Sequence, residues 1–186
     1  MSGPPEHDQL RMMNSVHMNN KITAVINTLN EESNIEACIR SLGPTGKYVD
    51  DILVCDNHSS DRTAEIARQS GARVVFHEKQ RYVTPSRRFA YTQTDSEWIL
   101  SLDADERGTT ELLKQLKTLS DNDQCDVYRF AKLQYFFGRP MKHGGWFSEI
   151  FPQFFRRKFF LDNYRGDKEG AHFDFESVSY AKRSFV

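Results

Sequence analysis

The chain has 186 residues, enough for one domain with a buried core. Hydrophobic residues make up 38% and charged residues 27%, and a formal net charge of −1 gives no reason to expect nucleic acid as a partner. No apolar run approaches membrane-spanning length, and no apolar signal core is expected near the N-terminus. The three widely spaced cysteines, Cys38, Cys55 and Cys125, are typical of reduced thiols in a cytoplasmic protein.

The chain is expected to contain a disordered leader followed by one domain. Residues 1–20 contain Pro, Gly and polar residues without periodicity. From residue 21 onward, β-branched and apolar runs predict strands over 21–30, 50–56, 72–78 and 97–103. Apolar residues at helical spacing predict helices over 33–43, 59–72, 84–94 and 108–120. The second helix could be capped by Ser59 or Ser60.

Strands that alternate with helices at these spacings predict βαβ units and a mostly parallel sheet, an α/β fold. In such sheets ligands bind at the carboxyl ends of the strands. Three of the predicted strand ends are polar, over residues 27–32, 56–61 and 103–106. After Asp126 the aromatic, β-rich segments contain internal prolines and predict antiparallel or edge strands beside the sheet.

An Asp-x-Asp pair, Asp103 and Asp105, follows the fourth predicted strand. Two carboxylates at a strand end can reach one hard cation, and Mg²⁺ or Mn²⁺ binds oxygen ligands together with substrate phosphates. A cation on a diphosphate would neutralise charge on a departing nucleoside diphosphate. The alternative is that both acids are solvated, or cap the helix that follows.

Three motifs together resemble glycosyltransferase family 2. They are INTLNEE (26–32), VCDNHSSDRTAEIA (54–67) and ILSLDADE (99–106). The segment QYFFGRPMKHGGWFSE (Gln134 to Glu149) is similar to the lipopolysaccharide core glucosyltransferases of that family. The similarity runs from Ile22 to Arg157 and covers most of the chain.

The resemblance implies the GT-A fold, a Rossmann-like nucleotide-sugar-binding sheet with a small, aromatic-rich antiparallel C-terminal part. Residues 21–186 would form this single domain. Residues 21–125 would be the nucleotide-sugar-binding half, and residues 126–186 the acceptor-side half. Because family members usually extend further, that second half is expected to be truncated.

The resemblance also implies which residues bind the nucleotide. Thr28, Asn30 and Glu31 match the loop that lies against the nucleotide. Asp56 matches the acid that hydrogen-bonds the base, as suits a carboxylate facing an imide N–H. Asp61 matches the second acid of its motif, with capping of the nearby helix as the alternative.

At the diphosphate, Asp103 matches the acid near the ribose and the metal, and Asp105 matches the direct ligand of Mg²⁺ or Mn²⁺. Arg87 falls where the family has a basic residue beside the diphosphate, and its neighbour Arg88 is the comparison. Either arginine could instead lie on a solvated helix face. Glu106 is expected only to support these acids.

Inverting transfer requires a general base that deprotonates the acceptor hydroxyl. The subfamily has an adjacent His-Glu pair for this step, and DKEGAHFDFE (167–176) contains none. Glu169 is the preferred substitute and His172 the nearest alternative, with Asp174 and Glu176 still open. Glu149 matches an acidic position expected to face the acceptor.

Two aromatic segments could contact the acceptor. His143 and Trp146 flank paired glycines, and the Trp face could stack on a sugar ring, although a core Trp beside a tight turn is the alternative. The segment Phe154 to Phe160 could rest on an anionic membrane surface, although a strand with one buried face is the more common structure.

The resemblance implies an inverting, metal-dependent transferase that moves glucose from UDP-glucose to a lipopolysaccharide core or related envelope glycan. The enzyme would act in the cytoplasm, in peripheral contact with the cytoplasmic face of the inner membrane. One alternative is a family 2 enzyme for a polyprenyl phosphate or capsule acceptor. The other is a nucleotide-binding module with weak catalysis.

Overall fold

The computed structural model of the chain describes residues 20–78, 84–121, 125–130, 132–133, 135–136, 139–140, 153–163 and 181–182. The strands are β1 (Ile22–Thr28), β2 (Asp51–Asp56), β3 (Arg73–Phe76), β4 (Trp98–Asp103), β5 (Val127–Arg129), β6 (Tyr135–Phe136), β7 (Arg139–Pro140), β8 (Phe154–Arg156) and β9 (Ala181–Lys182). The helices are α2 (Ile35–Ser41), α3 (Thr63–Gln69), α4 (Thr84–Thr92), α5 (Thr110–Ser120) and α6 (Arg157–Asn163). The predicted alternation of strand and helix is confirmed from β1 to α5.

The main sheet has seven strands in the order β3-β2-β1-β4-β8-β5-β9, and β6 pairs with β7 in a separate sheet. Strands β1 to β4 run parallel, whereas β8 is antiparallel to both β4 and β5. The expected mostly parallel sheet with an antiparallel aromatic part is therefore confirmed. The aromatic strand β8 lies inside the sheet, between β4 and β5, and not at its edge.

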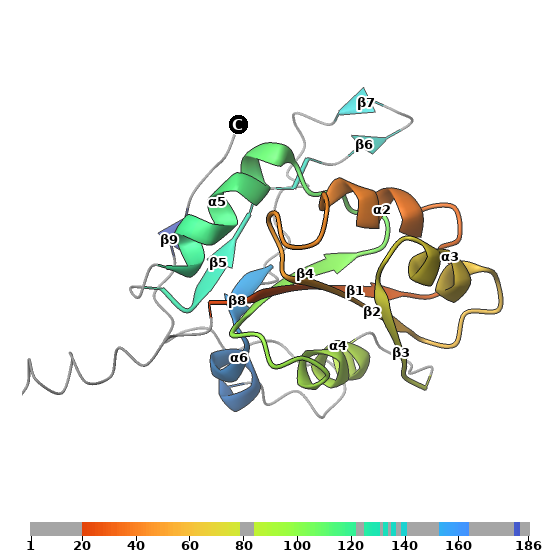
Figure 1. Cartoon of the computed structure of the whole chain (residues 1–186), viewed down its shortest axis with the longest axis horizontal. Helices are drawn as coiled ribbons and strands as arrows, with labels where there is room; N and C mark the ends of the chain where they lie inside the picture. Colours follow the sequence, from red (N-terminus) through yellow and green to blue (C-terminus); the bar gives the residue numbers. More distant parts are fainter. Residues whose placement is uncertain are drawn as a thin grey trace, which may run out of the picture.

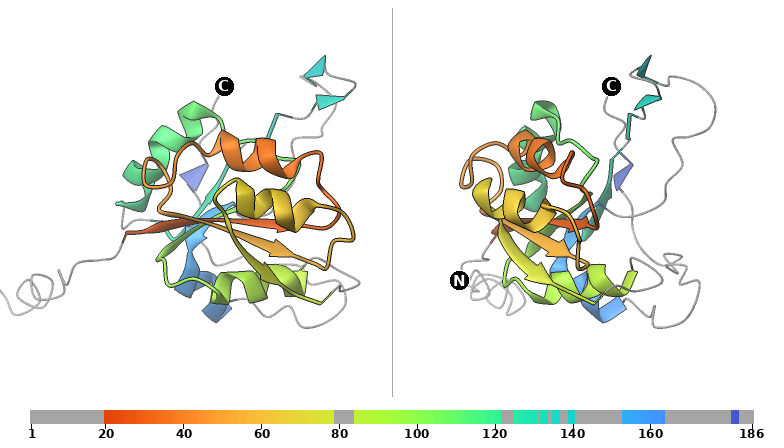
Figure 2. Two further views of the ribbon diagram at one scale, coloured as in Figure 1. Left: turned by 45° about the vertical axis from the view of Figure 1, so that its right-hand side comes forward. Right: turned by 90° about the vertical axis from the view of Figure 1, so that its right-hand side faces the viewer.

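Helices cover both faces of the sheet. Helices α2, α3 and α5 lie on one side, and α4 and α6 lie on the other (Figures 1 and 2). Each layer has its own buried cluster, one that includes Ile26, Val54 and Leu116, and one that includes Val25 and Leu53. Because β1 is central and covered on both faces, all seven of its residues are buried.

Aromatic side chains attach strand β8 and helix α6 to the parallel strands. Trp98 of β4 stacks on Phe154 of β8, with ring centroids 4.7 Å apart and planes inclined by 18°. On the opposite face, Tyr91 meets the edges of Phe155 and Phe160 at 5.2 and 5.0 Å. The aromatic enrichment of this part of the chain therefore serves the core on both sides of the sheet.

The expectation of a single strand over Phe154 to Phe160 is wrong. The strand ends at Arg156, and α6 begins at Arg157. The backbone N–H of Arg157 donates to the carbonyl of Glu97 at 2.7 Å, and its Nε donates to the carbonyl of Ser96 at 3.0 Å. These bonds hold the chain where it leaves the sheet, and the helix then buries Phe160 in the second cluster.

Several predictions fall outside the described residues. The expected leader, residues 1–20, is described only at Asn20, and the greater part of residues 126–186 is likewise outside. Among the helices that the structure describes, none is both long and apolar enough to cross a membrane.

Replacing Phe154 by alanine is expected to destabilise the fold by about 3–5 kcal/mol, because the side chain is fully buried against Trp98 and Tyr128. Urea unfolding of the variant measures this loss. Leu133→Ala is the matched control, because Leu133 is 53% exposed and its truncation should change stability by less than about 0.5 kcal/mol. Equal, small losses in the two variants would contradict the assigned core.

Candidate functional site

The carboxyl ends of β1, β2 and β4 lie level with one another. They form the C-terminal border of the parallel strands, the polar edge of the sheet. Thr28 is paired with Asp56, and Asn27 is paired with both Cys55 and Asp103. Because side chains alternate along a strand, Thr28 and Asp56 lie on the face covered by α2 and α3. Asn27 and Asp103 lie on the face covered by α4. The predicted polar strand ends are therefore brought together, on two faces of the same edge.

Buried polar atoms gather at this edge. Asp56 is fully buried, and its Oδ1 accepts the backbone N–H of Ser59 at 2.6 Å. Within the described part of the chain, the other Asp56 oxygen, the Thr28 hydroxyl and both amide atoms of Asn27 have no hydrogen-bond partner. Each such group costs about 1–3 kcal/mol when it is left unsatisfied. A polar ligand bound at this edge would recover that cost.

The loops that follow β1 and β2 are hydrogen-bonded to each other. Asn30, at a positive φ of 56°, donates its backbone N–H to Ser59 Oγ at 2.8 Å. Its side-chain Oδ1 accepts the backbone N–H of Ser60 at 2.8 Å. The backbone N–H of Glu31 donates to Thr63 Oγ1, also at 2.8 Å. Asn30 and Glu31, which are expected to lie against the nucleotide, thus fix the conformation of the loop after β1. This loop is the rim of the site.

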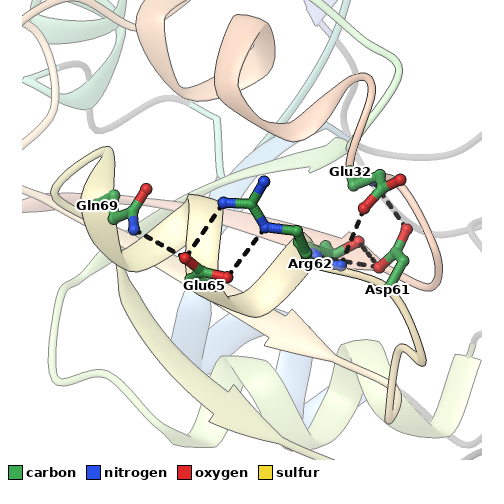
Figure 3. Close-up of polar contacts among 6 residues, drawn as sticks. Glu32, Asp61, Arg62, Glu65 and Gln69 are labelled. Atoms are coloured by element: carbon green, nitrogen blue, oxygen red, sulfur yellow. Dashed lines mark hydrogen bonds and ion pairs between the residues drawn. The ribbon is translucent and has the colours of Figure 1, made fainter.

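Charged side chains also join the loop after β1 to the loop after β2 (Figure 3). The backbone N–H of Glu32 donates to Asp61 at 3.1 Å, and the carboxylate of Glu32 accepts the backbone N–H of Arg62 at 3.0 Å. The guanidinium of Arg62 in turn pairs with Glu65 at 3.1 Å. The first two contacts join one loop to the other, and the third joins the residue before α3 to the first turn of that helix. These charged residues therefore fix the loops.

The expectation that Ser59 or Ser60 caps α3 is wrong, because both serines bond to Asn30. Asp61 takes the position at the helix start, where its carboxylate accepts the backbone N–H of Thr63 at 3.0 Å and also its hydroxyl. Desolvation acts against ionisation of this carboxyl group. The hydrogen bonds from Thr63 and Glu32 outweigh it and hold the pKa of Asp61 below its ordinary value.

The acids after β4 form a tight turn. The backbone N–H of Asp103 donates to Glu106 Oε2 at 3.0 Å, and the backbone N–H of Glu106 donates to the carbonyl of Asp103 at 3.0 Å. Glu106 also forms an ion pair with Lys132. Asp105 is exposed at the tip of the turn. Glu106 therefore shapes the turn, which presents Asp105 to solvent.

The expected alternative role of these acids, capping the next helix, does not apply. Helix α5 begins after Thr109, whose side chain accepts the backbone N–H of Leu112. Asp103 and Asp105 precede that cap and form no bond with the helix start in the described structure. Neither acid is therefore used as a helix cap.

Arg87 of α4 pairs with Asp103, with Nη2 2.5 Å from Oδ1. Burial of the guanidinium acts against its charge, but Asp103, Tyr91 and Glu106 outweigh it and raise the pKa of Arg87. Arg88 instead points toward α6 and donates to the carbonyl of Leu161 at 3.4 Å. Of the two adjacent arginines, Arg87 is therefore the one at the strand edge.

A small cavity of about 30 Å³ lies beside this ion pair. It admits water but is too small for a sugar nucleotide, so such a ligand would lie along the open edge. The lining residues are Arg87, Ser101, Leu102, Asp103, Glu106, Lys132 and Gln153.

Carboxylate oxygens suit a hard cation such as Mg²⁺ or Mn²⁺, which typically takes one or two carboxylates and completes its shell with phosphates and water. Asp103 and Asp105 supply that donor type at one turn. Within the described ranges no cluster of three or more acidic, His or Cys side chains could hold a metal by itself. Burial raises the pKa of the Cys38 and Cys55 thiols to about 12.

The structure brings Thr28, Asp56, Arg87, Asp103 and Asp105 to one edge. Asn30 and Glu31 lie in the loop that follows β1 at the same edge. The residues expected on the acceptor side lie outside the described residues; they are His143, Trp146, Glu149, Glu169, His172, Asp174 and Glu176.

Sequence reasoning gave no site role to three residues at this edge: Asn27, Lys132 and Gln153. Asn27 was included in the polar strand end over residues 27–32, and its place next to Thr28 at the end of a buried strand could have marked it as a site residue. Lys132 and Gln153 carry no local signal, because only the folded chain brings them to the cavity beside Asp103.

A family model described as Glycosyl transferase family 2 matches residues 23–186. An uncharacterized glycosyltransferase of Rickettsia bellii (strain RML369-C) is 36% identical over 108 residues, which cover 58% of this chain and 35% of that protein. One of Rickettsia felis (strain ATCC VR-1525 / URRWXCal2) is 35% identical, with coverage of 58% and 37%. The chain thus spans about a third of the length of the curated relatives it matches.

Solved structures share the fold. S. aureus TarS 1–349 superposes with a TM-score of 0.62 at 22% identity, over 77% of this chain and 49% of TarS. Glucosyl-3-phosphoglycerate synthase from Mycobacterium tuberculosis, solved in complex with UDP, superposes with a TM-score of 0.53 at 21% identity, over 70% and 50%. At these identities the likeness shows the fold alone, and it agrees with the predicted α/β class.

Thr63→Val is expected to raise the pKa of Asp61 toward its ordinary value of 3.8, because the variant loses the hydroxyl donor. Since the pKa is lowered in the folded chain, the associated stability is present above the unfolded value and is lost as pH falls through the folded value. The variant should therefore lose less stability on acidification.

Thr63→Ser keeps the hydroxyl and serves as the control. NMR titration of the Asp61 carboxyl group measures the pKa in both variants. An unchanged pKa in Thr63→Val would show that the backbone bonds alone set it.

Proposed function

The chain belongs to glycosyl transferase family 2, and on that basis we propose that it forms the donor-binding part of an enzyme that transfers a sugar from UDP-sugar with inversion. The observation that carries the proposal is the buried oxygen of Asp56 that has no hydrogen-bond partner among the described residues. Asp56 is level with Thr28 of β1, and β1 lies between β2 and β4, the strand that bears Asp103. A nucleotide laid along this edge would reach all three residues.

Asp56 would recognise the base. Its first oxygen is held by the Ser59 N–H, which fixes the direction of the second. A carboxylate in this position accepts the imide N–H of uracil, and burial excludes competing water. The rim formed by Thr28, Asn30 and Glu31 would lie against the nucleotide.

Asp103 and Asp105 would hold Mg²⁺ or Mn²⁺ on the diphosphate, and Arg87 would face the same phosphates. When bound, the cation stabilises negative charge on the departing UDP. Arg87 fits this position, because a buried guanidinium keeps its charge and offers paired donors to phosphate oxygens. The turn made by Glu106 would set the position of Asp105.

UDP as the donor nucleotide is supported by the structural neighbours. TarS 1–349 has been solved in complex with UDP and with UDP-GlcNAc, and glucosyl-3-phosphoglycerate synthase in complex with UDP. Glucose as the transferred sugar, and the lipopolysaccharide core as acceptor, rest on the similarity of Gln134 to Glu149 to the core glucosyltransferases. A polyprenyl phosphate or capsule glycan is the alternative acceptor.

For the acceptor side we keep the residues that the resemblance implies. Glu169 would deprotonate the acceptor hydroxyl, with His172 as the alternative and Glu149 facing the acceptor. His143 and Trp146 would contact its sugar rings. The enzyme would work in the cytoplasm, at the inner face of the membrane that holds its acceptor.

Asp56→Asn is expected to weaken UDP binding at least tenfold. The amide keeps an acceptor for Ser59 but can turn its NH₂ toward the uracil N–H, so that a donor faces a donor. CDP should lose less affinity, because the corresponding ring nitrogen of cytosine is an acceptor. Calorimetry with both nucleotides measures the two effects.

Asp95→Asn is the control for that comparison, because Asp95 is exposed and precedes β4, away from the strand ends. Equal affinity of Asp56→Asn and the wild-type chain for UDP would remove Asp56 from the base site.

Release of UDP from UDP-glucose, in the presence of Mn²⁺ and a heptose-containing core oligosaccharide, tests the transfer itself. Asp105→Ala should lower this turnover at least a hundredfold, because it removes the exposed carboxylate. UDP binding in EDTA should be unchanged, since the base contact at Asp56 remains.

Arg88→Ala is the matched control, because its guanidinium bonds to Leu161 in α6. Transfer only to a polyprenyl phosphate would replace the proposed acceptor. UDP binding without transfer to either acceptor would leave a nucleotide-binding module.

A further inference from the structure

We propose that His58 and Phe76 form an aromatic shelf that packs against the nucleobase beside Asp56 and thereby sets the affinity for the nucleotide. This inference rests on the proposed function and adds two residues to its donor site. They follow β2 and end β3, and neither was singled out by sequence reasoning.

Register places Phe76 next to the base-reading acid. Phe76 is the Cα partner of Asp56 on the neighbouring parallel strand, so both side chains lie on the face covered by α2 and α3. The backbone N–H of His77 donates to the carbonyl of Asp56 at 3.0 Å and keeps the two strand ends together. Phe76 is nevertheless 46% exposed, beside a fully buried carboxylate.

His58 lies across from this ring. The two ring centroids are 5.8 Å apart, with planes inclined by 32°. His58 has a positive φ of 58°, which is uncommon for a residue with a side chain. The preceding residue, Asn57, donates both its backbone and side-chain N–H groups to the carbonyl of Thr28 at 3.0 Å. The position of the His58 backbone is therefore tied to β1.

Arg68 of α3 supports the shelf from the helix side. Its guanidinium carbon lies 5.3 Å from the centroid of the Phe76 ring, a cation–π contact. Two flat side chains with exposed surface thus stand next to a buried acceptor that has no partner among the described residues.

The chemistry of a pyrimidine ring fits both features. Its edge carries the N–H that a carboxylate accepts, and its faces gain free energy by packing on aromatic rings. A phosphate would be repelled by the Asp56 carboxylate, since both are anionic. A sugar hydroxyl could donate to Asp56, but only the base offers an N–H edge and two flat aromatic faces in one rigid ring. The shelf therefore favours a base at this end of the site, with the diphosphate toward Asp103.

Calorimetry with UDP and Mn²⁺ on the full chain tests the shelf. Phe76→Leu keeps an apolar side chain without the ring, and His58→Asn keeps a residue that tolerates positive φ. Each of these two variants should bind UDP roughly tenfold more weakly than the wild-type chain. Phe76→Tyr keeps the ring and should keep the wild-type affinity. Binding of inorganic pyrophosphate with Mn²⁺ should be the same in all four proteins.

A second readout reports packing directly. Uracil H5 and H6 should move upfield in the NMR spectrum when UDP binds the wild-type chain, and less so in Phe76→Leu and His58→Asn. Unchanged UDP affinity and unchanged shifts in both variants would overturn the shelf while leaving the donor site in place. No UDP binding by the wild-type chain would overturn the proposed function and the shelf together.

Discussion

The parallel register of β1 between β2 and β4 is the constraint on which the rest of the site depends. It sets Thr28 level with Asp56 and Asn27 level with Asp103. Because the side-chain period of a strand is two, a slip of one residue would exchange the faces on which these groups lie. Burial of β1 on both sides makes such a slip costly, so the hydrophobic core also fixes the geometry of the polar edge.

The two faces of this edge carry different chemistry. On the α2–α3 face, a buried carboxylate and aromatic rings suit a flat heterocycle. On the α4 face, Arg87 and Asp103 form an ion pair, and the turn after Asp103 exposes Asp105. A nucleoside diphosphate has the same division between base and phosphates, so the sheet edge alone would order the two ends of the proposed ligand. The bonds from Asn30 and Glu31 to the loop after β2 keep the rim in place.

The sequence predicted those features that local periodicity and strand-end polarity encode. The strands from β1 to β4, the helices between them, and the placement of Asp56, Asp103 and Asp105 at strand ends all belong to this class. Features that arise only from contacts between distant segments were not predictable. Helix α6 begins inside a run that was predicted as a strand. The bonds from the backbone N–H and the Nε of Arg157 to the chain just before β4 are not visible in the run itself. The ion pair between Lys132 and Glu106 was not predictable for the same reason, because it joins segments that are distant in the sequence.

The two acids of the Asp-x-Asp pair differ in what else they do. Arg87 is largely buried, and a buried cation that loses its counter-charge is strongly destabilising. Asp103 therefore supports the fold of this corner whatever ligand binds there, and substituting it would disturb helix α4 together with any cation. Asp105 is exposed and makes no side-chain hydrogen bond to the described residues, so its removal would isolate the proposed ligand-binding role. Of the two carboxylates, Asp105 is consequently the one whose loss would separate the proposed metal binding from folding.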